Sequence, residues 1–156
     1  MKSVFTFLAV LFLFLLLSPS AKAQGIGNPG QIITTSFANA QFGLPIESFA
    51  FNRKALINIL RKSRGYIMFG YKERRFIIAD NKRNVIYPEG ATVNKDEVLH
   101  NFGMDVMEDF LSRLESNKVN IEMRPGGVLT ISEDKPGEED GVTLEYSIPC
   151  PPLCPW

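Results

Sequence analysis

The sequence is poor in the residues on which most small catalytic and metal sites depend. It contains two cysteines, one tryptophan and a single histidine, His100, in 156 residues. A Ser-His-Asp or Cys-His site would have to be built around that one imidazole, and the Gly-x-Ser-x-Gly nucleophile motif is absent. Neither Cys-x-x-Cys nor His-x-x-x-His occurs, so a conventional zinc site has no ligand set. We therefore expect no metal and no cofactor, and we favour a protein that is not an enzyme.

Only one long hydrophobic run is present, and it is too short to span a bilayer. It covers residues 4–17, about 14 residues, whereas a transmembrane helix needs ~20. Lys2 precedes the run and the small-residue pattern Ala21-Lys22-Ala23 follows it, which is typical of a secretory signal peptide. We predict that residues 1–23 are removed and that the mature chain has no integral membrane segment. The protein would then work in the periplasm or outside the cell.

Both cysteines lie in a proline-rich tail over residues 149–156. In an oxidising compartment two cysteines most simply pair with each other, so we predict a disulfide between Cys150 and Cys154. An extended polyproline segment would hold their Cα atoms ~12 Å apart, and a disulfide needs less than about 7 Å, so the tail must turn. Bridges to a second chain, free thiols and a bound soft metal are the alternatives. Trp156 would end a rigid knob that either packs on its own domain or contacts a partner.

The region between the arm at 24–45 and the tail shows alternating helical and strand periodicity. We expect residues 46–148 to form one domain and the arm to be flexible apart from a short strand over 31–35. The expected elements are a helix over 53–63 capped by Asn52, strands over 66–71, 75–79 and 84–87, a helix over 95–116, and strands over 118–123, 128–131 and 142–148. The predicted fold is α+β: an antiparallel sheet of about six strands with two helices packed on one face, in the order α-βββ-α-βββ.

Two glycines qualify this prediction. Asn94 and Glu97 have the spacing of a capping box, which favours a helix start there, but Gly103 falls in the middle of the apolar face of the expected helix. We expect either close approach of a strand at Gly103 or a break of the helix. Gly70 lies within the strand expected at 66–71, where it indicates a bulge or a crowded contact in a central strand.

Charge is divided along the chain. Residues 53–83 contain ten lysines and arginines against two acids, and residues 84–156 contain five basic residues against fourteen acids. Such a division can indicate that the basic half binds an anionic partner, or that the two halves attract each other. It can also reflect only the solvent-exposed sides of helices and hairpins. We predict a basic face for an anionic ligand or a partner. Its candidate residues are Arg61, Lys62, Arg64, Lys72, Arg74 and Arg75.

These observations favour an exported, non-catalytic binding or protein-interaction domain. The expected partner is another protein, an anionic surface or a polysaccharide. Residues 64–71, R-G-Y-I-M-F-G-Y, partly match the signature strand of RNA recognition motifs at their Arg-Gly-Tyr start and final Tyr, but Ile67 and Met68 occupy the middle positions. We therefore expect no nucleic acid. One alternative is a small exported hydrolase using His100 or carboxylates such as Asp105, Glu108 and Asp109. Another is a structural subunit that self-associates through its opposed charges.

Overall fold

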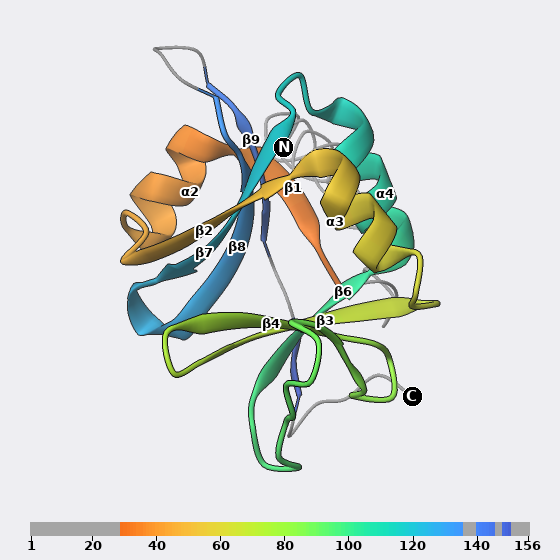
Figure 1. The fold of residues 1–156 in the computed structure, drawn as a ribbon. Helices are drawn as coiled ribbons and strands as arrows, with labels where there is room; N and C mark the ends of the chain where they lie inside the picture. The colour runs from red at the N-terminus through yellow and green to blue at the C-terminus, as the bar shows by residue number, and fades with distance from the viewer. Residues whose placement is uncertain (1–28, 136–139, 146–147, 151–156) are drawn as a thin grey trace, which may run out of the picture.

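The computed structural model describes residues 29–135, 140–145 and 148–150, which form two antiparallel sheets and three α-helices (Figure 1). Sheet A has the strand order β1 (Gln31–Thr34), β9 (Val142–Glu145), β8 (Val128–Glu133), β7 (Lys118–Arg124) and β2 (Glu47–Asn52). Sheet B has the order β10 (Ile148–Cys150), β6 (Leu99–Gly103), β3 (Tyr66–Lys72), β4 (Arg75–Ala79) and β5 (Val85–Tyr87). The helices are α2 (Thr35–Phe42), α3 (Arg53–Leu60) and α4 (Met104–Arg113). The α+β class and the antiparallel pairing are confirmed, whereas the prediction of one sheet with two helices is wrong in its strand count and arrangement.

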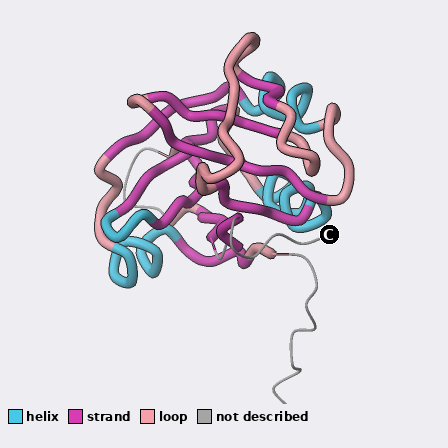
Figure 2. Tube along the Cα trace, turned by 90° about the horizontal axis from the view of Figure 1, so that it is seen from below, coloured by secondary structure: helices cyan, strands magenta, loops and turns pink. Residues whose placement is uncertain are grey.

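The three helices lie on different sides of the strands. In Figure 1, α2 stands on one side of sheet A, α3 and α4 stand on the other, and β3 and β4 cross below them. The view from below also shows the helices toward the outside of the strands (Figure 2). Sheet A is therefore covered on both faces.

The main apolar core lies between the two sheets and under α3 and α4. Strands β7 and β8 contribute Val119, Ile121, Leu129 and Ile131, all fully buried. Side chains of β3, β4, β6, α3 and α4 join the same cluster, including Ile67, Phe69, Ile78, Phe102, Leu56, Met107 and Phe110. Because strand side chains alternate between faces, the intervening residues of β7, β8 and β9 point to the opposite side of sheet A.

That opposite side carries a buried polar layer. Glu122, Arg124, Thr130, Ser132 and Thr143 are at most 7% exposed. Helix α2 covers these residues. The alternating pattern of the strands predicts one buried and one solvent-exposed face of the sheet, but both faces of sheet A are buried here.

The predicted helix over 95–116 is wrong in its first half. Residues 99–103 form β6, which pairs antiparallel with β3 from Tyr66↔Gly103 to Phe69↔His100, and the helix begins only at Met104. Asn94 and Glu97 do make the expected contact, because the Asn94 N–H donates to Glu97 Oε2 at 2.7 Å, but they close a turn. Gly103 is the last residue of β6 and the N-cap of α4, so the glycine marks a change from strand to helix and not the break of one helix into two that we had considered.

Residues outside the predicted elements also fold. Helix α2 lies within the arm that we expected to be flexible, and β2 precedes the first predicted helix. Thr34 caps α2 by accepting the Phe37 N–H at 3.2 Å. The predicted signal peptide over residues 1–23, Cys154 and Trp156 lie outside the described residues. Only the backbone of Cys150 is described, and in β10 it pairs with Leu99 of β6.

Candidate ligand-binding groove between α3 and α4

Helix α3 begins where the sequence predicts it. Asn52 Oδ1 accepts the N–H groups of Lys54 and Ala55 at 3.0 and 3.3 Å, which satisfies two backbone donors that a helix start leaves open. Leu56 and Leu60, four residues apart, are buried against the core. The remaining face of α3, with its arginines and Ile57, is left toward α4.

Helix α4 runs alongside α3 in the opposite direction. A hydrogen bond at each end of the pair joins the start of one helix to the residues that follow the other. The Met104 N–H, at the start of α4, donates to Gly65 O at 2.9 Å, in the loop that follows α3. At the other end, Arg53 Nη1 donates to Leu114 O at 2.7 Å. The start of α3 therefore lies beside the end of α4.

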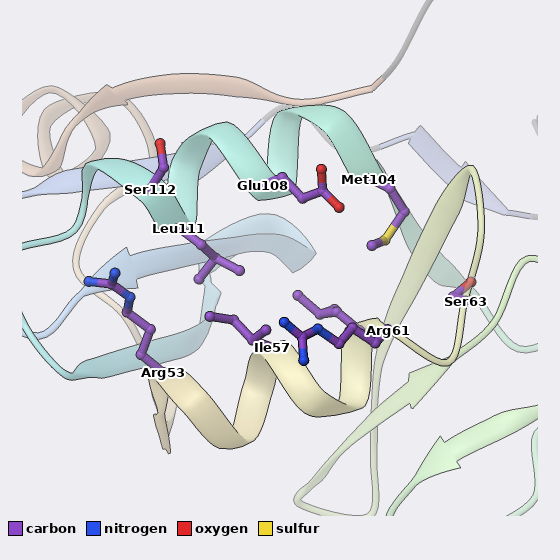
Figure 3. Close-up of a pocket in the computed structure, with 9 residues that line it drawn as sticks. Arg53, Ile57, Arg61, Ser63, Met104, Glu108, Leu111 and Ser112 are labelled. Carbon is purple, nitrogen blue, oxygen red and sulfur yellow. The ribbon is translucent and has the colours of Figure 1, made fainter.

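A groove of about 520 Å³ lies between the two helices (Figure 3). Its lining residues are Arg53, Ile57, Leu60, Arg61, Ser63, Met104, Glu108, Leu111 and Ser112. Ile57, Leu60, Leu111 and Met104 make an apolar floor, and the polar side chains stand around it. A volume of this size lies within the range of small-molecule sites, which are mostly apolar with a few polar groups.

The two walls of the groove carry opposite charges. Arg53 and Arg61 project from the α3 side, and Glu108 projects from the α4 side (Figure 3). Among the described residues, neither Arg61 nor Glu108 forms an ion pair. The rise of 1.5 Å per helical residue places the Cα atoms of Arg53 and Arg61 ~12 Å apart along the groove.

The structure does not bring the six predicted basic residues onto one face. Arg61 lines the groove, and Lys62 and Arg64 are exposed in the turn just after α3. The other three residues of the set lie at the opposite end of β3, which spans seven residues, or ~23 Å at strand rise.

Two of those distant cations are already paired. Lys72 forms an ion pair with Glu97, which also raises the pKa of the Lys72 ammonium and lowers the pKa of the Glu97 carboxyl. Arg74 Nη2 lies 3.4 Å from Glu47 Oε1. Arg75 is exposed at the start of β4. The predicted basic face is thus two separate groups of three residues, and only one of them adjoins the groove.

The residues considered for catalysis are dispersed. His100 lies in β6, not in a helix, and burial lowers the pKa of its imidazole. Asp109 pairs with Arg113 on the exposed side of α4 at 2.7 Å. Within the described ranges, no three His, Cys, Asp or Glu side chains come together as a metal site would require.

Sequence reasoning missed Arg53 as a site residue. It lies in the basic segment, and its position directly after the cap Asn52 was visible, but nothing local shows that Leu114, 61 residues away, accepts its hydrogen bond. Glu108 was considered only as a possible catalytic acid. Its place opposite two arginines depends on how α4 packs against α3.

No protein family, curated protein or solved structure matches this chain. None of the helices in the described part of the chain is long and apolar enough to cross a membrane.

Proposed function

We propose that the protein is an exported, non-catalytic binding domain and that its α3–α4 groove binds a small carboxylate with an apolar body. The observation that carries this proposal is the position of Arg53. Its guanidinium stands at one end of an apolar groove and is held there by Leu114 O at 2.7 Å. A fixed cation beside an apolar floor is complementary to a ligand with one anionic end and a hydrophobic remainder.

Arg53 has donors left for such a ligand. A guanidinium carries five N–H groups in a planar fork that matches a carboxylate, and the bond to Leu114 O uses only Nη1. That bond also restrains the side chain before a ligand arrives, which reduces the entropy lost on binding. Ser112 lines the groove near the same end, but its hydroxyl donates to Asp109 O at 2.7 Å and so adds no donor for a carboxylate.

The groove is less suited to hydrolysis. Cleavage of a glycosidic bond needs two carboxyl groups facing each other across the bond, and Glu108 is the only acid among the lining residues. The binding hypothesis uses Arg53 and the apolar floor, whereas the hydrolase hypothesis uses Glu108 alone.

The test is calorimetric titration of the purified protein with octanoate and with octanol. We expect octanoate to bind and octanol to bind at least tenfold more weakly, because a charge-assisted hydrogen bond is worth about 1.5–3 kcal/mol. Arg53→Gln should remove that difference. Lys54→Gln, which changes an exposed cation on the same turn, should leave it intact. Equal binding of the two ligands, or no binding of either, would refute the proposal.

A further inference from the structure

We infer that the ligand of this groove is a short peptide zwitterion of two or three residues, whose carboxylate contacts Arg53 and whose ammonium group contacts Glu108. This inference rests on the proposed function and adds a second charged group to the ligand. It comes from three features of the groove: the sign of the charge on each wall, the spacing of the charged side chains and the chemistry of the floor.

The charges favour a ligand with two groups of opposite charge over simpler ligands. A fatty acid would use Arg53 and leave the Glu108 carboxylate, which lies near the middle of the groove, without an ionic partner (Figure 3). A dicarboxylate would bring its second anion next to Glu108, which repels it. A ligand with one ammonium and one carboxylate satisfies both Arg53 and Glu108, and Arg61 is then available to donate to a peptide carbonyl.

The spacing sets the length. Glu108 precedes Ser112 by four residues and Leu114, the partner of Arg53, by six. At 1.5 Å per residue these offsets correspond to ~6–9 Å along α4. An extended peptide spans at most ~3.3–3.6 Å per residue, so two or three residues cover the distance from the carboxylate site to the ammonium site.

The floor selects the side chains. Ile57, Leu60 and Leu111 present aliphatic surface between the two charged ends, so the peptide should carry aliphatic side chains. Ser63 and Ser112 line the groove as well, but their hydroxyls already donate to Tyr66 O at 2.6 Å and to Asp109 O at 2.7 Å. Their oxygens are left as acceptors only.

The ligand side of the test compares trileucine with two blocked forms, N-acetyl-trileucine and trileucine amide, by calorimetric titration of the purified protein at pH 7. A free α-amino group has a pKa near 7.7–8.0, so it is mostly protonated there. We expect each blocked form to bind about tenfold more weakly than trileucine, as loss of one charge-assisted contact implies. Equal binding of the free and acetylated peptides would overturn the inference.

The protein side of the test uses Glu108→Gln, with the exposed Glu89→Gln as its matched control. Glu108→Gln should weaken trileucine binding about tenfold, remove the advantage over the acetylated peptide, and strengthen binding of nonanedioate. These opposite signs cannot arise from a general loss of folding. If Glu108→Gln leaves the preference for the free amine unchanged, the inference is wrong.

The two levels of proposal fail separately. If octanoate binds through Arg53 and trileucine binds no better than N-acetyl-trileucine, the zwitterion is refuted and the carboxylate site stands. If octanoate does not bind, or binds no better than octanol, the proposed function is refuted and the inference is refuted with it.

Discussion

Arg124 is fully buried, and each nitrogen of its guanidinium donates a hydrogen bond to a neighbouring residue. Nε donates to Thr130 Oγ1 at 2.8 Å, and Nη2 donates to Glu122 Oε2 at 2.8 Å. Nη1 donates to Asn39 Oδ1 at 2.8 Å and to Gly43 O at 2.6 Å. A buried charge is tolerable only when it is paired and hydrogen-bonded in this way. The arginine therefore joins sheet A to α2 and to the loop that follows it.

Replacement of Arg124 by methionine should be strongly destabilising. It leaves the Glu122 carboxylate buried without its cation, and breaking one side of a buried pair costs about 3–5 kcal/mol. The control is Arg113→Met, which breaks an exposed pair with Asp109 and should cost at most ~0.5 kcal/mol. Urea denaturation measures both. Similar midpoints for the two variants would contradict the role assigned to Arg124.

His100 should make stability depend on pH near neutrality. Burial lowers the pKa of its imidazole in the fold, whereas the unfolded value is about 6.5. The unfolded chain then binds the proton more readily than the folded chain. The free energy of unfolding is therefore highest above about pH 6.5, and it decreases as the pH drops below that value. His100 is the only histidine. His100→Gln should flatten the profile between pH 7.5 and 5.5, and an unchanged slope in that variant would refute the assignment.

At the scale of elements, the cap of α3 offers a direct measurement. Asn52→Ala removes the acceptor for two N–H groups and should cost about 1 kcal/mol, within the ~0.5–2 kcal/mol range of such caps. Asn58→Ala, at an exposed position inside the same helix, should be neutral or slightly stabilising, because alanine has the higher helix propensity. Thermal or urea unfolding separates the two. A destabilisation at Asn58 as large as that at Asn52 would show that the cap is not the cause.

Strand β3 requires glycine at position 70. A methyl group there would lie 2.5 Å from Leu99 Cδ2, and Leu99 is itself buried with Met68 and Ala79. Gly70→Ala should therefore destabilise by about 1–3 kcal/mol, the usual effect of overpacking. In the double variant with Leu99→Val, the combined loss should be smaller than the sum of the single losses. Strict additivity in urea denaturation would argue against this contact.

The sequence predicted most strands and the first helix because their signals are local. Asn52 followed by paired leucines specifies α3, and the hairpin of β3 and β4 has short polar turns between apolar runs. The helix prediction for residues 95–116 was wrong for a physical reason. Leu99, Phe102, Val106 and Phe110 have the spacing of a helical face, yet Leu99 and Phe102 lie in a strand. Pairing of β6 with β3 outweighs the local preference, as tertiary contacts often do.

Long-range contacts also explain what was missed at the site. The sequence showed that residues 53–64 are basic and that α4 has an acidic face. It gave no way to know that Arg53 meets Leu114 across 61 residues, or that Lys72 would be paired with Glu97 at the far end of β3. Charge along the chain is a poor guide to charge in space when strands separate neighbouring residues by ~3.3 Å each.

At the scale of the molecule, aromatic side chains hold the two sheets together. Phe51 of β2 in sheet A lies 5.1 Å from the ring of Tyr87 of β5 in sheet B, and Phe49 lies 6.3 Å from Phe76 of β4. Because Phe51 belongs to the main core cluster that both sheets share, the sheets should unfold as one unit.

Truncation of Phe51 tests this. Phe51→Ala should lower the free energy of unfolding by about 3–5 kcal/mol, as is usual for a buried phenylalanine, while the transition remains single by both circular dichroism and tyrosine fluorescence. Phe37→Ala, at a position that is 55% exposed on α2, should cost far less. Two separated transitions in the Phe51 variant would show that the sheets are independent.

The pairing of β1 with β9 has a consequence for how the molecule is made. β1 lies at the edge of sheet A and, in the described part of the chain, pairs there only with β9, from Gln31↔Glu145 to Thr34↔Val142. A nascent polypeptide that has grown only to residue 140 thus holds an early strand whose complement has not yet been translated. β1 can therefore take its place in sheet A only after β9 has been synthesised, and the sheet cannot be completed in the order in which its strands leave the ribosome.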